Sequence, residues 1–409
     1  MASISPADLA RELLDDCLTG ADWRAETLEA LVAMACDADA GRALEASRAL
    51  FGILIERLGD LFEPRLCDVY ARLFSQAMQQ ARPELRADEL IARYHRVRRP
   101  PSPPEDISRV YLLSRVTLGA DVAATSVLLD AMKRRYPAAE ICFVGSRKGW
   151  EIFAGDPRIR HVQSPYARTG TLVERLAAGF ALRDALAGED AIVADPDSRL
   201  TQLGLLPVCD EERYFFFESR SFGGDGEDAM PVLAARWAEQ TFGVRRARPY
   251  VAPKAGGLHA DITVSLGVGE NPAKRIGDPF EAELLRTLAA TGRTVLVDKG
   301  GSEEESARVE RAAAECGGRV RTWQGAFAPF AAAIAGSRLY VGYDSAGQHV
   351  AAASGVPLVT IFAGFPSERM FQRWRPHGPG PMRVVRVDDP EPERVLEKVR
   401  RAIGEFHFP

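Results

Sequence analysis

The stretch from Arg338 to Phe362, RLYVGYDSAGQHVAAASGVPLVTIF, constrains the fold most, because it reads as strand, polar turn, helix and strand within 25 residues. Its two apolar runs are typical of strands that are buried on both faces of a parallel sheet. The helix between them is expected to begin near Ala346, directly after the N-cap candidates Asp344 and Ser345. Such a helix points its free N–H groups and its positive dipole end at the crevice beyond the strand, where a phosphate can bind.

The same alternation of strands and helices runs from Ile107 to the C-terminus. It predicts two consecutive α/β domains, residues 107–250 and 251–409, each with a doubly wound, Rossmann-like parallel sheet. In the first domain we expect a short helix at about 150–153 and a strand at 214–217. Two such domains facing each other across a cleft bring the carboxyl ends of their strands together, which is where ligands bind in open α/β sheets.

The N-terminal region, residues 1–95, contains helical periodicity and no strand signal. It begins with a capping sequence at Ser5–Asp8 and is interpreted as an all-α bundle. Four prolines in RVRRPPSPPED, residues 96–106, predict a stiff linker that separates the bundle from the first α/β domain. No residue of the bundle has a catalytic arrangement, so we expect it to serve docking to a protein partner, self-association or substrate presentation.

Composition excludes several classes of protein. The 409 residues are 46% hydrophobic and 27% charged, as in an ordinary globular protein of two or three domains. A net charge of -5 argues against a general nucleic-acid binder. The first residues lack the features of a signal peptide and no apolar run could form a transmembrane segment, so a cytoplasmic protein is expected. The six cysteines include no C-x-x-C pair, so no metal or redox site is expected from them.

Glycine-containing turns follow four of the expected strands, and each lets the backbone approach a ligand closely at a helix start. None of the four matches a complete dinucleotide-binding or P-loop motif. They lie at 117–121, 267–271, 299–302 and 343–347.

Several segments in this order resemble glycosyltransferase family 9, the ADP-heptose:lipopolysaccharide heptosyltransferases. LLSRVTLGADVAATSVLLDAMKRRYP resembles the family's first strand, glycine loop and helix; GVGENPAKRIGDPF and VDKGGSEEESARVERA resemble later segments. The most specific match is YDSAGQHVAAASGVPLVTIF, with the spacing Asp-Ser-x-x-x-His-x-x-Ala-Ala-x-Gly-x-Pro, followed by RWRPHG. The resemblance covers residues 107 to the C-terminus and leaves out the helical region.

The resemblance implies a GT-B fold in which residues 251–409 hold a nucleotide sugar and residues 107–250 hold the acceptor. It implies inverting, metal-independent transfer of a heptose or similar sugar from a nucleoside diphosphate, expected to be ADP-heptose, with no further cofactor. The acceptor implied is a hydroxyl of a glycan, glycolipid, natural product or protein. The donor-binding residues that it implies are Lys274, Arg275, Gly300, Asp344, Ser345, Ala346, Gly347 and His349.

On the acceptor side the resemblance implies that Asp121 is the catalytic base and that Gly119 lies beside it. Here the sequence reads Gly-Ala-Asp, whereas the family usually has aspartate directly after glycine, and Asp121 could instead cap its helix. His349 is open to two interpretations in the same way, diphosphate contact or a core histidine.

The pair Asp195 and Asp197 allows three interpretations: a divalent-metal site, hydrogen bonds to an acceptor, or an ordinary turn. In the acceptor interpretation, Asp197, Ser198 and Arg199 bind the acceptor and there is no metal ligand. Residues 219–224 could form a loop over the cleft. Trp374 could stack on the base or close the cleft, although a lone aromatic is more often a packing residue.

Two alternatives to sugar transfer remain open from the sequence. One is a catalytically silent protein that binds a sugar nucleotide, which the inserted Ala120 keeps open. The other is a GT-B nucleotide-sugar epimerase, which would consume the donor with water in place of an acceptor.

Overall fold

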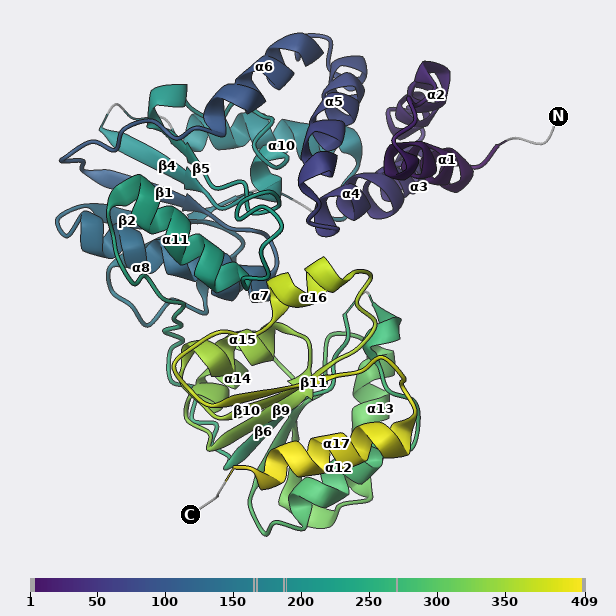
Figure 1. The fold of residues 1–409 in the computed structure, drawn as a ribbon, viewed down its shortest axis with the longest axis vertical. Coiled ribbons are helices and arrows are strands. Elements are labelled where there is room, and N and C mark those ends of the chain that lie inside the picture. The colour runs from purple at the N-terminus through teal and green to yellow at the C-terminus, as the bar shows by residue number, and fades with distance from the viewer. Residues whose placement is uncertain are drawn as a thin grey trace.

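The computed structural model describes residues 4–164, 166, 168–186, 188, 190–269 and 271–406. Two parallel sheets lie one above the other in Figure 1, and the helical N-terminal region packs beside the upper sheet. The predicted α/β class with two Rossmann-like domains is confirmed. No helix in the described part of the chain is long and apolar enough to cross a membrane.

The first sheet has five parallel strands in the order β3-β2-β1-β4-β5. The strands are β1 (Arg109–Leu113), β2 (Glu140–Gly145), β3 (Ile159–Gln163), β4 (Ala191–Asp195) and β5 (Tyr214–Phe216). The strand order reverses between β1 and β4, so the loops that follow these two strands border the crevice where ligands bind in such sheets.

Side chains alternate between the two faces of this sheet, as the period of a β-strand requires. Tyr111 and Leu113 belong to a core shared with the N-terminal helices and α10 (Leu172–Ala185). Val110 and Leu112 face the opposite core, which contains α8 (Ser126–Arg135) and α11 (Met230–Phe242).

The second sheet has six parallel strands in the order β11-β10-β9-β6-β7-β8. They are β6 (Ile262–Ser265), β7 (Val295–Asp298), β8 (Val320–Trp323), β9 (Leu339–Tyr343), β10 (Leu358–Phe362) and β11 (Met382–Arg386). One face is covered by α14 (Phe327–Ala335) and α15 (Ala346–Ala353) and the other by α12 (Phe280–Ala289), α13 (Glu303–Ala314) and α17 (Pro392–Gly404) (Figure 1). The core around α14 and α15 continues into that of the first sheet, so apolar contacts join the two domains.

The N-terminal region is entirely helical in the described residues, as predicted. Its helices are α1 (Pro6–Thr19), α2 (Ala25–Ala35), α3 (Ala40–Ala49), a π-helical segment (Leu50–Ile55), α4 (Glu56–Asp60), α5 (Pro64–Ala81) and α6 (Ala87–Val97). The side chain of Ser5 caps the first helix by accepting a hydrogen bond from the Asp8 N–H at 3.2 Å. These helices share one continuous core with the first sheet. The Pro-rich segment therefore marks a change from helices to strands but does not separate two cores.

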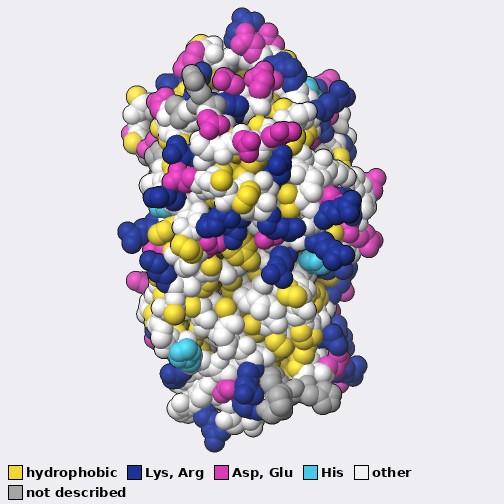
Figure 2. Space-filling model, turned by 90° about the vertical axis from the view of Figure 1, so that its left-hand side faces the viewer, with side chains coloured by type: hydrophobic (Ala, Val, Ile, Leu, Met, Phe, Trp, Pro, Cys, Tyr) yellow, Lys and Arg dark blue, Asp and Glu magenta, His cyan; other side chains and the backbone are white. Residues whose placement is uncertain are grey.

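The apolar side of the N-terminal helices is used inside the molecule. Among the described residues, the large hydrophobic side chains that are exposed are Ile4 and Val173. On the face drawn in Figure 2, hydrophobic side chains are interspersed with charged ones. The structure thus gives no support to a docking role for these helices that would rest on a large apolar surface.

Local differences from the sequence-based prediction have identifiable causes. The short helix expected at 150–153 is α9 (Arg147–Trp150), because Ser146 caps it by accepting from the Gly149 N–H. The strand expected at 214–217 ends at Phe216. Helix α16 (Glu368–Trp374) was not expected from the RWRPHG pattern; its N-cap is Ser367.

Candidate functional site

The strongest polar contact at the start of α15 joins two strand-end turns that are 70 residues apart in sequence. The Nζ of Lys274 lies 2.8 Å from Oδ2 of Asp344 and 3.0 Å from its carbonyl oxygen. Both side chains are largely buried, so water weakens their attraction little. A lysine ammonium has three donors, and two are used here, which leaves one for a ligand oxygen.

Gln348, which sequence reasoning missed, fixes the orientation of the Asp344 carboxylate. It is fully buried; its Nε2 donates to Oδ1 of Asp344, and its Oε1 accepts from the Thr360 hydroxyl at 2.6 Å. The same Nε2 is 3.2 Å from the carbonyl oxygen of Trp374. The only sign of this role in the sequence is the spacing of four residues between Asp344 and Gln348.

The other residues at the N-terminal end of α15 contact neighbouring protein side chains. Ser345 is the N-cap residue, but its side chain makes no capping hydrogen bond; its hydroxyl lies 3.4 Å from that of Tyr340. A β-carbon on Gly347 would overlap the Tyr340 ring and hydroxyl. The glycine at this position therefore makes room for Tyr340, whereas the sequence suggested close approach of a ligand.

His349 is buried one turn inside α15. Burial lowers its pKa to about 4, with a smaller opposing effect from the Asp344 carboxylate. Its ring lies 6.0 Å from that of Trp374. A neutral histidine of this kind fits the core interpretation better than that of a cationic phosphate ligand.

Two of the implied donor residues lie away from the Lys274–Asp344 pair. Arg275 turns toward Asp278, at 2.6 Å, and Glu281, at 3.7 Å. Gly300 adopts φ of 80°, and the Glu305 carboxylate occupies its turn by accepting from the Gly301 N–H at 3.0 Å. The N–H group expected to face a phosphate there already has an acceptor.

Asp121 is buried. It is 1% exposed, and its carboxylate accepts hydrogen bonds from the Ser114 hydroxyl at 2.7 Å, the Arg115 N–H at 2.7 Å and the Thr125 hydroxyl at 2.8 Å. Burial raises its pKa to about 6, and these three hydrogen bonds partly offset that effect. Asp121 therefore holds the loop after β1 in place, and its position does not support the role of catalytic base.

The local helix geometry explains this burial. The helix starts earlier than expected, at Leu118, with Thr117 as its N-cap residue, so Asp121 is not a cap. Residues Asp121–Thr125 form a π-helical turn, which is how a helix accommodates one additional residue. Ala120, the inserted residue, lines the pocket, and Asp121 is rotated into the core.

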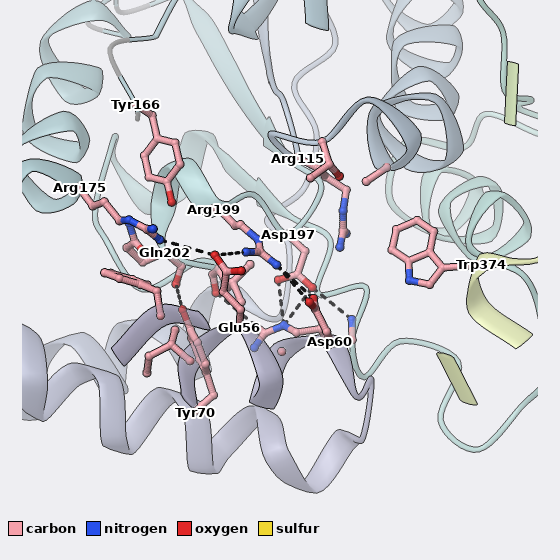
Figure 3. Close-up of a pocket in the computed structure, with 17 residues that line it drawn as sticks. Glu56, Asp60, Tyr70, Arg115, Tyr166, Arg175, Asp197, Arg199, Gln202 and Trp374 are labelled. Atoms are coloured by element: carbon pink, nitrogen blue, oxygen red, sulfur yellow. Dashed lines mark hydrogen bonds and ion pairs between the residues drawn. The ribbon is translucent and has the colours of Figure 1, made fainter. Parts of the chain in front are cut away.

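A polar pocket lies between the N-terminal helices and the first sheet (Figure 3). Glu56, Asp60 and Tyr70 reach it from the helices, whereas Arg115 and Arg199 come from the loops after β1 and β4 (Figure 3). Its full lining is Phe51, Ile55, Glu56, Gly59, Asp60, Tyr70, Arg115, Thr117, Ala120, Tyr166, Arg175, Asp197, Arg199, Gln202, Leu203, Arg220 and Trp374. The helical region thus lines the candidate site, although no motif in its sequence indicated which of its residues would do so.

Arg199 joins the helical region to the sheet. Its Nη1 lies 2.5 Å from Oε1 of Glu56, and its Nη2 lies 3.1 Å from Oδ1 of Asp60. Glu56 also pairs with Arg175, at 3.6 Å. Burial opposes ionisation of the Glu56 carboxyl, but Arg199 and Arg168 hold its pKa below its usual value. Arg199 lines the pocket, and its contact with an acceptor stays a prediction.

Asp195 and Asp197 have different partners and do not form a pair. Asp195 accepts from Thr201 and Tyr214, each at 2.5 Å, whereas Asp197 accepts from Nε of Arg220 at 3.0 Å. The divalent-metal interpretation has no support from this geometry. The described residues contain no group of three or more His, Cys, Asp or Glu that could hold a metal ion.

Ser198 and Ser219 are structural as well. The hydroxyl of Ser198 donates to the Ser114 carbonyl and accepts from the Leu200 N–H at 3.0 Å, so it is not presented to an acceptor. Ser219 is fully buried and donates to Asp197 at 2.9 Å. The expectation of a loop over the cleft at 219–224 is wrong for its first two residues, because Ser219 and Arg220 are core residues.

Trp374 lies where the three parts of the chain meet. Its ring is 5.7 Å from Phe62 of the helical region and 5.9 Å from the Arg115 guanidinium of the first domain. Neighbouring Arg373, which is fully buried, donates to the carbonyls of Gly226 and Asp228 at 2.7 and 2.8 Å. Helix α16 therefore holds the second domain against the first, and these contacts give Trp374 a packing role.

Backbone strain is concentrated around the pocket. Non-glycine residues with positive φ are uncommon, and strained residues cluster at functional sites. Three of them, Asp197 (69°), Gln202 (52°) and Leu203 (57°), line the pocket, and Val116 (76°) lies between two of its lining residues. The strain therefore supports a functional role for this pocket.

Comparison with known proteins agrees with this architecture. Residues 212–396 match the family model of glycosyltransferase family 9 (heptosyltransferase). The structure is similar to E. coli heptosyltransferase WaaC with ADP, with a TM-score of 0.55 and 16% identity over 73% of this chain and 99% of WaaC. It is similar to the family 9 glycosyltransferase of Veillonella parvula DSM 2008, with a TM-score of 0.52 and 14% identity over 75% of this chain and 92% of that one. No curated protein sequence matches the chain significantly.

The paired Rossmann-like domains and the family match together define a glycosyltransferase with the GT-B fold. Residues 212–396 are similar to glycosyltransferase family 9, the family that the sequence resembles. An additional helical region precedes the GT-B domains.

Proposed function

We propose that the protein is an inverting, metal-independent glycosyltransferase that moves a heptose or similar sugar from a nucleoside diphosphate to an acceptor hydroxyl. The observation that carries this proposal is the Lys274–Asp344 pair at the start of α15, where one ammonium donor is left for a diphosphate oxygen. The N-terminal end of α15 favours negative charge at the same place. ADP-heptose is the proposed donor, since one similar structure is E. coli heptosyltransferase WaaC with ADP-2-deoxy-2-fluoro heptose (TM-score 0.51, 16% identity over 73% of this chain and 99% of that one).

In an inverting reaction, a base removes the proton of the acceptor hydroxyl as the anomeric carbon is attacked, and the nucleoside diphosphate leaves. Lys274 then stabilises the charge that develops on the leaving diphosphate. Asp60 is better placed than Asp121 to act as the base. Its side chain is 48% exposed and lines the pocket, where it pairs with Arg199, whereas Asp121 is 1% exposed.

The buried position of Asp121 also favours a second candidate function, a protein that binds a sugar nucleotide without turning it over. Both functions require nucleotide binding, but only the glycosyltransferase turns the donor over. A thermal-shift series with ADP, UDP and GDP is expected to show stabilisation by ADP, because a ligand that binds only the folded state raises the unfolding temperature. Stabilisation by none of the three would contradict both functions.

Transfer itself is tested with ADP-heptose, a pool of glycan acceptors and EDTA, and with mass spectrometry of the products. We expect acceptor-dependent transfer that EDTA does not reduce. Donor binding without turnover would favour the silent protein, and donor consumption without acceptor would favour an epimerase.

A further inference from the structure

The pocket between the helices and the first sheet has more hydrogen-bond donors than acceptors. Arg220 is 2% exposed, and its Nε donates to Asp197 while its Nη2 donates to the carbonyl oxygen of Leu203 at 3.3 Å. Its Nη1 atom and the Nε2 atom of Gln202 are buried and have no hydrogen-bond partner in the described part of the chain. Each such donor costs about 1–3 kcal/mol if it stays unpaired, so both favour a ligand that supplies acceptor oxygens.

The pocket also carries one positive charge in excess. Four arginines and three carboxylates line it. Arg175, Arg199 and Arg220 each pair with a carboxylate. Arg115 donates instead to the Pro196 carbonyl at 2.6 Å and the Ser219 hydroxyl at 2.5 Å, and its guanidinium forms no ion pair with the described residues.

The size of the pocket restricts what can enter. Its volume is about 60 Å³, well below the roughly 300 Å³ at which pockets for whole small molecules begin. The volume of a carboxylate or a phosphate group is of the same order as that of the pocket. The rest of the ligand would lie outside the pocket. The rings of Tyr166 and Trp374, which are partly exposed, border the pocket and offer apolar faces to that remainder.

From these observations we propose that the pocket binds a carboxylate or phosphate group of the sugar acceptor, with Arg115, Arg220 and Gln202 as its donors and the N-terminal helices as one wall. This inference rests on the proposed glycosyltransferase function and names the chemical class of its acceptor. The contribution of the helices is specific. The Tyr70 hydroxyl donates to the Gln202 carbonyl at 3.0 Å and so holds the positive-φ turn that presents the Gln202 amide.

The test uses three methyl glycosides that share one ring: methyl glucuronide, methyl glucoside 6-phosphate and neutral methyl glucoside. Binding to the full chain is measured by ligand-observed NMR, with ADP present so that phosphate does not report on the donor side. We expect at least one of the two anionic glycosides to bind about ten-fold or more tightly than methyl glucoside, as a hydrogen bond to a charged group provides. Which one binds better distinguishes a carboxylate from a phosphate.

Arg115→Gln is expected to lower the ratio of anionic to neutral glycoside affinity by about ten-fold or more, and Tyr70→Phe is expected to lower it less. Arg147→Gln is the matched control, since Arg147 is exposed and pairs with Glu151 away from the pocket. Thermal unfolding of each variant shows whether it is folded. Equal binding of the three glycosides, no saturable binding of any, or an unchanged preference in Arg115→Gln would overturn the inference. Stabilisation by ADP would still report separately on the proposed function.

Discussion

Gly119, in the turn after β1, packs directly against Ala346 at the start of α15, and a β-carbon on the glycine would lie 3.5 Å from Cα of Ala346. The same β-carbon would lie 3.4 Å from Cδ2 of His349. The two glycine turns that the sequence assigned to opposite sides of a cleft are therefore in contact. Side-chain size at these turns sets how closely the domains approach.

Gly119→Ala should be tolerated, because the added methyl group would make ordinary van der Waals contacts. Gly347→Ala should be much more harmful, since its β-carbon would overlap the buried Tyr340 hydroxyl, and overpacking of this kind costs about 1–3 kcal/mol. Denaturant unfolding of both variants measures the difference. Equal destabilisation by the two substitutions would contradict the packing described for α15.

Lys274→Ala should weaken ADP binding by about ten-fold or more, because it removes a charged donor to the diphosphate and leaves the Asp344 carboxylate without its cation. Arg275→Ala is the matched control from the neighbouring position. Its guanidinium turns toward Asp278 and Glu281, so the change in affinity should be small. Isothermal titration with ADP compares the two, and an equal loss in both variants would argue against Lys274 as the specific phosphate ligand.

The stability of the protein should depend on pH through Asp121. Its folded-state pKa is raised to about 6, above the value of about 3.9 in an unfolded chain, so the folded protein binds this proton more tightly. The stabilisation is fully present below about pH 4 and is lost as pH rises through about 6. In Asp121→Asn the group is neutral throughout. The unfolding free energy of Asp121→Asn, relative to that of the wild type, should therefore increase between pH 4 and pH 7.

Asp195 has a similarly raised pKa, but it is present in both proteins and cancels in this difference. A difference that does not change with pH would contradict the assignment.

Activity gives a second readout for Asp121→Asn and Asp60→Asn. If Asp60 is the base, its substitution should lower kcat by about 100-fold or more, and loss of Asp121 should act mainly through stability. The reverse order would restore Asp121 as the base.

Arg373→Gln should loosen the contact between α16 and the loop at 224–228. The arginine is fully buried and donates to the carbonyls of Gly226 and Asp228, which the substitution would leave unpaired at a cost of about 1–3 kcal/mol each. Arg375→Gln, which removes one bond to the Glu227 carbonyl, should have a smaller effect. Limited proteolysis of the loop reports on this contact, and equal cleavage of both variants and the wild type would contradict the role of α16.

Much of the fold could be predicted because it depends on local pattern. Apolar runs, some of them followed by glycine turns, predicted the strands of both sheets. In the stretch 338–362, β9, α15 and β10 lie where the sequence indicated. Helix α16 was missed because its seven residues form a stable helix only through tertiary contacts, such as those of Arg369 and Arg373 with the loop at 224–228.

The candidate site was only partly predictable. Lys274 and Asp344 could be assigned from a specific motif and do lie together. The pocket beside the first sheet could not be found in this way, since Glu56, Asp60 and Tyr70 are ordinary residues of amphipathic helices until those helices pack on the sheet. The burial of Asp121 likewise depends on a π-helical turn whose position no sequence pattern fixed.

The sequence by itself determined the two parallel sheets, the helical N-terminal region and the donor motif, because hydrophobic periodicity, capping residues and turn glycines act over a few residues. The tertiary structure alone decided which carboxylates are buried, which arginines remain without an ion pair among the described residues, and that the helices line a pocket beside the first sheet. These properties depend on burial and on contacts between residues far apart in the chain, such as Arg199 with Glu56 and Asp60. No local pattern encodes them.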